Sequence, residues 1–145
     1  MPQQPDLMIN ISASPFDYTH VEDRKATVKQ NVLKYRLPMI YVNATGAQTQ
    51  TIFDGTSLVF DKDANLCGKL DQFEEDDTCI VVTDEGMIEC AVIEPAAAIP
   101  DRLLAPERFI PTLNIAQIRK AIVLGVRDYF RKSGLTKAIV GNSGG

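Results

Sequence analysis

Two short apolar runs, separated by one amphipathic segment, constrain the fold of this chain more than any other feature. Leu7–Ser12 and Met39–Val42 are nearly continuous apolar runs, which predicts strands buried on both faces. Between them, Thr19 and Glu22 fit a capping box at the start of a helix. This helix should end near Arg36, because the residue before a proline avoids the helical region. A strand, a helix and a strand within about 35 residues predict a parallel crossover unit.

The middle of the chain changes to short β-rich runs. Thr51–Gly55 and Ser57–Phe60 are joined by an Asp-Gly turn signal. Lys62–Asn65 is a further turn signal and leads into Leu66–Leu70. These runs predict a meander of antiparallel strands, and Cys79–Val82 is another strand candidate.

The last third of the chain begins with a segment rich in proline and alanine, Glu94–Pro111, which predicts a semi-rigid linker. A helix should follow, with Asn114 as its N-cap, Gln117 at the third position and Gly134 at its C-terminus. Lys137–Val140 then predicts a strand. The apolar side chains of the helix recur at helical spacing and predict one buried face, made of Ile115, Ile118, Ile122, Val126 and Tyr129.

Composition excludes several classes of protein. The net charge of -4 argues against nucleic acid as a partner, and no apolar run reaches the ~18–20 residues of a membrane span. The chain does not start like a secretory signal, and its three cysteines are odd in number and lack CxxC spacing. A reducing cytoplasm is therefore expected, without a disulfide framework or zinc site. His20 is the single histidine, and the acidic run Glu74–Asp77 is expected to be a solvated loop.

Several stretches, taken in order, resemble one enzyme family. The first is Asn10–Phe16, followed by the first helix and Leu37–Asn43. The second is Phe53–Ser57 with the strand after it, and the third is Ala121–Tyr129 followed by Ile139–Gly145. From about residue 7 onward, this ordered set resembles glutamine-dependent NAD synthetases.

The resemblance implies an α/β fold in two parts. Residues 1–93 would be the C-terminal part of a nitrilase-like glutamine amidohydrolase domain, which is an αββα sandwich. Residues 94–112 would be the linker. Residues 113–145 would give the first helix and strand of a doubly wound nucleotide-binding domain, the ATP-pyrophosphatase domain of the family.

The resemblance also implies the chemistry. A cysteine thiolate, with a Glu base and a stabilising Lys, releases ammonia from glutamine, and the ammonia displaces AMP from adenylated deamido-NAD to form NAD. The complete enzyme would use ATP and Mg2+, and a homo-oligomer is expected. The family's triad lies upstream of Asn10, so no catalytic residue is assigned here and the chain alone should be inactive. The resemblance leaves Cys67, Cys79 and Cys90 as small buried side chains.

The resemblance assigns few site residues. Ser14 matches a serine that helps to hold glutamine, although it could instead cap the turn. His20 is the other glutamine-binding candidate, since it stands where the family has Lys or Arg as a carboxylate anchor; a neutral imidazole is a weaker anchor, and His20 could instead be exposed at the start of the helix without a role. The uncharged run Gln48–Gln50 replaces a family acid. The end of the chain resembles the start of an ATP-binding loop or is a flexible tail, and the ATP-binding candidates are Gly141, Ser143, Gly144 and Gly145.

Two alternatives remain open from the sequence. The chain could belong to another amidase of the nitrilase superfamily, but such an enzyme has no reason to carry residues 113–145. It could also be a non-catalytic remnant that binds a partner, since half a sandwich would leave one sheet face uncovered.

Overall fold

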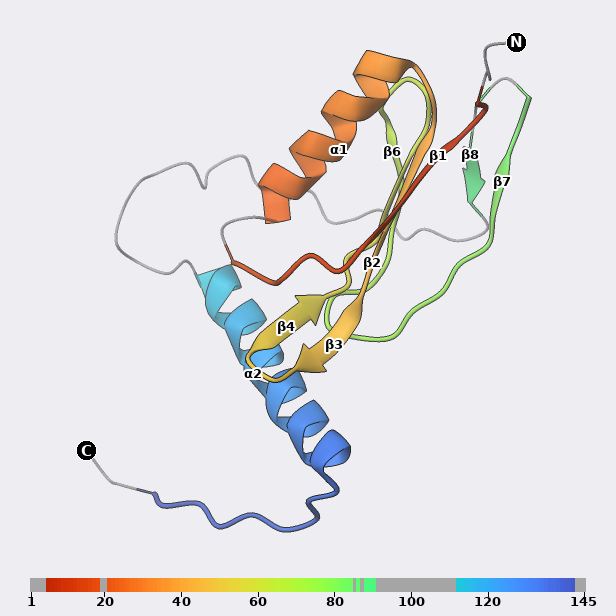
Figure 1. The fold of residues 1–145 in the computed structure, drawn as a ribbon. Coiled ribbons are helices and arrows are strands. Elements are labelled where there is room, and N and C mark those ends of the chain that lie inside the picture. Colours follow the sequence, from red (N-terminus) through yellow and green to blue (C-terminus); the bar gives the residue numbers. More distant parts are fainter. Residues whose placement is uncertain (1–4, 19–20, 85, 87, 91–111, 143–145) are drawn as a thin grey trace.

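The computed structural model describes residues 5–18, 21–84, 86, 88–90 and 112–142, which form a mixed α/β fold (Figure 1). Its elements, in chain order, are β1 (Met8–Ser12), α1 (Val21–Tyr35), β2 (Met39–Asn43), β3 (Thr45–Gln48), β4 (Thr51–Asp54), β5 (Leu58–Phe60), β6 (Leu66–Lys69), β7 (Ile80–Val82), β8 (Ile88–Cys90) and α2 (Thr112–Ser133).

A four-stranded sheet in the order β1-β2-β5-β6 is the centre of the fold. β1 and β2 are parallel, with Met8 beside Met39 and Ser12 beside Asn43, and α1 connects them. β5 runs antiparallel to both β2 and β6. The predicted parallel crossover is therefore confirmed.

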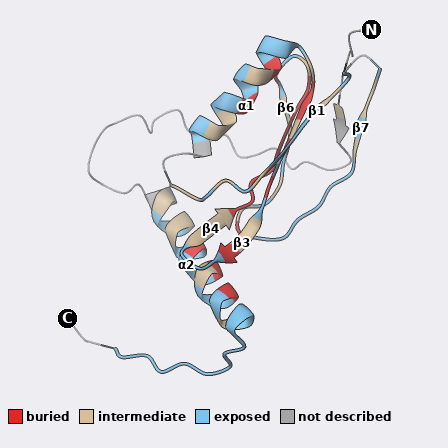
Figure 2. Cartoon of the chain, in the orientation of Figure 1, coloured by how far each residue is buried: buried red, intermediate tan, exposed pale blue. Residues whose placement is uncertain are grey.

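Helix α1 covers one face of this sheet and supplies its larger hydrophobic core. The helix stops at Tyr35 because Arg36 has a φ of 56° and a proline follows at position 38. Figure 2 shows buried residues concentrated where α1 meets the strands. The buried members of this core are Val28, Val32, Met39, Tyr41, Leu58, Phe60 and Ala64, and Met8 and Leu66 pack against them.

The opposite face of β1 is open, which corrects the prediction that this strand is buried on both faces. Ile9 is 62% exposed and Ile11 is 83% exposed, and Val42 at 40% corrects the same prediction for β2. Ile9 and Ile11 pair with Ile40 and Val42 of β2. Side chains alternate between the two faces of a strand, and Met39 faces the core under α1, so Ile40 and Val42 point to the opposite face. β1 is also an edge strand of the sheet: it pairs with β2 on one side, and no described strand pairs with its other side.

The predicted meander is partly wrong. β4 pairs with β3, which the sequence had not suggested as a strand, and this hairpin is separate from the larger sheet. The Asp-Gly signal does not join β4 to β5 in a hairpin, because Gly55 and Thr56 both have positive φ and redirect the chain. The next predicted turn is confirmed, since Asp61 Oδ1 accepts the backbone N–H groups of Asp63 and Asn65 between β5 and β6.

Two predictions for the segment after this turn have different outcomes. The strand expected at Cys79–Val82 is present as β7 and pairs antiparallel with β8. Most of the expected linker, residues 94–111, lies outside the described ranges.

Helix α2 packs against the β3–β4 hairpin with a different face from the one predicted. It begins at Thr112, two residues before the expected cap, and buries Ala121 and Leu124. Of the predicted buried face, Ile115, Ile122, Val126 and Tyr129 are each more than half exposed. The hairpin covers a narrow stripe, and a Cβ added to Gly125 would lie 3.2 Å from Cδ1 of Ile52. Small side chains therefore allow the close approach.

The end of the chain is partly as predicted. Gly134 has a φ of 67°, and the N–H of Leu135 donates to the carbonyl of Phe130, as expected of a glycine helix cap. The strand predicted at Lys137–Val140 is absent, and Ile139 and Val140 are exposed. A strand requires a neighbour to complete its ladder, and the described ranges place no strand beside this segment. Neither described helix is long and apolar enough to span a membrane.

Candidate functional site

Polar side chains gather where β1, β2 and β4 end, and most are buried. Asn43 is the last residue of β2, Asp54 is the last residue of β4, and Thr56 and Ser57 precede β5. All four are buried, with Asp54 0% exposed. Buried polar groups are costly unless they are hydrogen-bonded, so such a cluster requires a closed set of partners.

Asn43 ties the predicted glutamine-site serine to this cluster. The N–H of Ser14 donates to Asn43 Oδ1 over 2.8 Å, and Asn43 Nδ2 reaches the carbonyl of Ser14 at 3.4 Å. Asn43 Nδ2 also donates to the carbonyl of Gly55 over 2.9 Å. Both Ser14 contacts use its backbone, so Asn43 fixes the main chain at the position from which the Ser14 hydroxyl projects.

Asp54 is the acceptor at the centre of the cluster. Its carboxylate accepts from Arg24 Nη1 at 3.0 and 3.2 Å and from Thr56 Oγ1 at 2.9 Å. Gln72 Nε2 donates to it over 3.2 Å, and Asn43 Nδ2 lies 3.3 Å away. The negative charge is thus compensated by one buried guanidinium and several neutral donors.

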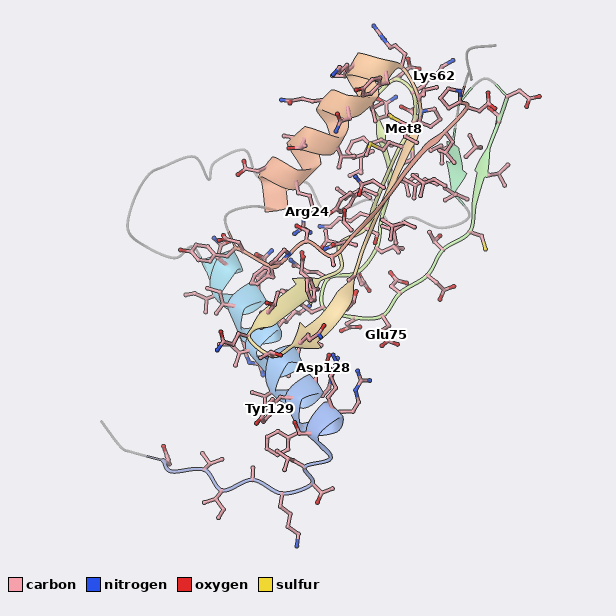
Figure 3. All side chains as sticks on the ribbon, in the orientation of Figure 1. Met8, Arg24, Lys62, Glu75, Asp128 and Tyr129 are labelled. Carbon is pink, nitrogen blue, oxygen red and sulfur yellow. The ribbon has the colours of Figure 1, made fainter. Side chains whose placement is uncertain are left out.

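Arg24 extends from α1 into this cluster, as Figure 3 shows. Its side chain is 8% exposed, and Nη1 contacts Asp54 and the carbonyl of Gly55. Its Nη2 is buried and has no hydrogen-bond acceptor among the described residues. An unsatisfied buried donor costs about 1–3 kcal/mol, so an acceptor at this point would be stabilising.

The predicted site residues are brought together only in part. Ser14 lies beside the cluster, and His20 is outside the described residues. Sequence reasoning missed Arg24, because a charged residue of an amphipathic helix is expected on its solvent side. The signal was present, because Arg24 lies four and eight residues before Val28 and Val32, on the face of α1 that packs against the sheet.

A second cluster joins α2 to the segment that follows Ser14. Phe73, Ala121 and Leu124 are buried together, and Phe16 and Ile52 pack against them. The rings of Phe16 and Phe73 meet edge to face with their centroids 4.9 Å apart.

A polar contact also holds α2 on the hairpin. Asp128 is 1% exposed, and its Oδ2 accepts the N–H of Ala47 over 2.8 Å. Lys132 Nζ donates to the carbonyl of the same Ala47. Asp128 Oδ1 lies 3.4 Å from Arg131 and 3.7 Å from Arg127, both largely exposed. Figure 3 shows Asp128 and Tyr129 as neighbours on α2, with Asp128 on the side of β3.

Of the predicted ATP-binding residues, the structure describes Gly141. Gly141 is exposed, and a Cβ added there would have no atom within 4 Å. Packing does not require glycine at this position in the present fold. Ser143, Gly144 and Gly145 lie outside the described residues.

The cysteines and the acidic run remain to be placed. Neither described cysteine is buried, contrary to expectation: Cys67 is half-buried and its Sγ donates to the carbonyl of Asn65 over 3.5 Å, and Cys79 is exposed. The side chain of Cys90 is outside the described set. The acids of Glu74–Asp77 are exposed, as expected of a solvated loop. Within the described ranges, no three His, Cys, Asp or Glu side chains are grouped so as to hold a metal ion.

The known proteins that this chain resembles in sequence share one name. The chain is 32% identical over 144 residues to the glutamine-dependent NAD(+) synthetase of Rhodobacter capsulatus, and 30% identical over 140 residues to that of Synechocystis sp.. The Thermotoga maritima enzyme of the same name is 27% identical over 157 residues. These matches cover 96–97% of this chain but 23–27% of each relative, so the chain spans about a quarter of their length. No protein-family profile matches the chain.

Solved structures agree with the sequence matches. The chain superposes on the glutamine-dependent NAD+ synthetase of Acinetobacter baumannii, solved in complex with ADP, with a TM-score of 0.70 and 26% identity. That match covers 89% of this chain and 22% of the other. The Cytophaga hutchinsonii protein of the same name, 21% identical with a TM-score of 0.59 over 89% of this chain and 18% of the other, shares the fold.

Proposed function

We infer that this chain is a segment of a glutamine-dependent NAD(+) synthetase. The observation that carries this inference is the extent of the match, because 97% of the chain aligns with the Rhodobacter capsulatus enzyme. The match therefore includes both the β1–α1–β2 unit and α2. An unrelated nitrilase-like amidase would be expected to match the part before α2 alone, so the match disfavours that alternative.

We propose that the division expected from the sequence applies. Residues 1–93 would belong to the nitrilase-like glutamine-hydrolysing domain, 94–112 to the linker, and 113–145 to the start of the ATP-pyrophosphatase domain. The sheet supports the first assignment, because α1 covers one face while Ile9 and Ile11 leave the other open. A second sheet stacked on that open face would complete an αββα sandwich.

The glutamine site is proposed at the ends of β1 and β2. Ligands of α/β folds bind beyond the carboxyl ends of parallel strands, and Ser14 lies at that edge with its backbone fixed by Asn43. Arg24 belongs to the same network through Asp54 and carries a buried donor without an acceptor among the described residues. The family resemblance implies a carboxylate anchor at position 20, where this chain has His20, and Arg24, four residues later in the sequence, offers a permanent positive charge.

The complete enzyme would combine two reactions. Glutamine hydrolysis would release ammonia, which would attack adenylated deamido-NAD, forming the amide of NAD and expelling AMP. ATP with Mg2+ supplies the adenylyl group in the complete enzyme, and we assign the start of its phosphate-binding loop to Gly141, Ser143, Gly144 and Gly145. The Acinetobacter baumannii relative was solved with ADP, which supports an adenine nucleotide site in such proteins.

Glutamine titration of the 15N-labelled chain tests the site directly. We expect the amide signals of Ser14 and Asn43 to shift with millimolar L-glutamine, and the S14A variant to lose this response. The S133A variant, altered at an exposed serine at the end of α2, is the matched control and should respond like the unmodified chain. Equal responses of S14A and the unmodified chain would contradict the assignment.

A partner-binding role is the second candidate, and one observation favours it. Four large side chains of α2, at positions 115, 122, 126 and 129, are each at least 55% exposed. Contiguous apolar surface of this kind usually marks an interface. Such a role is compatible with a synthetase segment, because the same surface could contact other parts of the enzyme.

A further inference from the structure

The contacts of α2 reach the polypeptide immediately beside the proposed glutamine site. Phe16 follows Ser14 by two residues and packs against the cluster that contains Leu124 and Ala121 of α2. Its N–H donates to the carbonyl of Ile52 over 2.7 Å. The segment from Ser14 to Phe16 is therefore held on one side by Asn43 and on the other by residues that α2 covers.

Phe73 connects the same cluster to Asp54. The ring of Phe73 packs against Phe16, and its N–H donates to the carbonyl of Asp54 over 2.9 Å. Phe73 is 4% exposed, and Leu124 contributes to that burial. Truncating Leu124 would thus loosen the packing of both Phe16 and Phe73. Phe16 lies two residues after Ser14, and Phe73 is hydrogen-bonded to Asp54, so both sides of the polar network would be affected.

The polar contacts of α2 fix its position on the hairpin. Asp128 and Lys132 bind the N–H and the carbonyl of one residue, Ala47, so the helix can neither rotate nor slide without breaking both. A Cβ at Gly46 would lie 3.0 Å from Asp128 Oδ2, which shows how close the two elements are.

We propose that α2 positions the Ser14 segment, with Leu124 and Asp128 as positioning residues, so that the affinity for glutamine depends on how α2 is seated. The proposal rests on the proposed glutamine site and adds its control by the first helix after the linker. A change that displaces α2 would release Phe16, and the Ser14 backbone would lose its fixed geometry.

Hydrogen exchange of the full chain, combined with glutamine titration, tests this proposal. In L124A we expect the Phe16 and Ala47 amides to exchange at least about tenfold faster, and the dissociation constant for L-glutamine to rise several-fold. The α1 amides of Val28 and Val32, which belong to the other core, should keep their protection. The matched control is I122A, an exposed position on the same helix, and L124M should restore both readouts.

Each result decides the proposal. Unchanged Phe16 exchange in L124A, or faster exchange with unchanged glutamine affinity, would overturn it. If L124A fails to fold, D128A replaces it, because it releases the Ala47 N–H without emptying the hydrophobic cluster. If the unmodified chain binds no glutamine, the proposed glutamine site fails, and Phe16 exchange alone then decides whether α2 positions this segment.

Discussion

Arg24 and Asp54 form the most deeply buried ion pair among the described residues, and their environment explains why both persist. Asp54 also accepts from Thr56 and Gln72, so its charge is well solvated by protein groups. Asp54 has donors besides Arg24, whereas the acceptors described for Arg24 are Asp54 and the carbonyl of Gly55. Arg24 would therefore lose more of its hydrogen bonding without Asp54 than Asp54 would without Arg24. Loss of the carboxylate should therefore be the more damaging change.

The D54A variant should lower the free energy of unfolding by about 3–5 kcal/mol, because it leaves a buried guanidinium without its counter-charge. Urea denaturation followed by circular dichroism measures this difference. E75Q removes an exposed carboxylate and should change stability by less than about 0.5 kcal/mol. Equal stabilities of D54A and E75Q would contradict the assigned role of the pair.

Gly46 provides a second test at the scale of single residues. Its φ is 128°, and an added Cβ would lie 3.0 Å from Asp128 Oδ2, so G46A should destabilise the chain by about 1–3 kcal/mol. G141A, where an added Cβ meets nothing within 4 Å, should be nearly neutral. Thermal unfolding of both variants checks the contrast, and a neutral G46A would show that α2 is not seated as described.

Some site residues could be predicted from the sequence and others could not. Ser14 was predicted from the family resemblance, supported by its place just after an apolar run and before a proline. Arg24 could in principle have been predicted from its spacing to Val28 and Val32, but its charge favoured the solvent side of the helix. The role of Asp54 could not be predicted, because an Asp-Gly pair indicates an exposed turn. Tertiary contacts bury Asp54 here.

Among the secondary-structure elements, those with local signals were predicted and those that need partners were not. β1, α1 and β2 carry apolar runs, helical spacing and a proline stop. β3 was missed because Thr45–Gln48 has no apolar pattern and forms by pairing with β4. The opposite holds for Lys137–Val140, where the sequence pattern predicted a strand that does not form. No strand in the described ranges lies beside it to complete a ladder.

Helix α1 offers a prediction about its buried face. Val32 is fully buried and its neighbour Leu33 is 46% exposed, so V32A should lower the free energy of unfolding by about 2 kcal/mol. L33A should cost less than about 1 kcal/mol although it removes more atoms. Urea denaturation of the pair gives the comparison, and a reversed order would mean that α1 packs with a different face.

The described residues leave two groups of large apolar side chains exposed. Ile9 and Ile11 lie open on the sheet, and the apolar side chains of α2 lie open elsewhere. This surface predicts self-association at micromolar concentrations, which light scattering after size exclusion can measure. A double variant, I122D with V126D, should reduce the apparent mass, whereas K120A, at an exposed lysine of the same helix, should not. A strictly monomeric unmodified chain would contradict this expectation.

Membership in the NAD synthetase family is the central claim at the scale of the whole molecule. It rests on matches that extend across 97% of the chain, while those matches cover about a quarter of each relative. We propose that the polar cluster around Asp54 helps to hold glutamine, and that the seating of α2 on the β3–β4 hairpin positions the Ser14 segment beside it.

A chimera tests that claim most directly. In it, this chain replaces the matching quarter of the Rhodobacter capsulatus synthetase, and NAD formation from deamido-NAD and ATP is measured with glutamine and with ammonia. We predict NAD formation with both nitrogen sources, and selective loss of the glutamine-dependent rate when S14A is introduced. A folded chimera that forms no NAD from either source, while the unmodified relative does, would contradict the assignment.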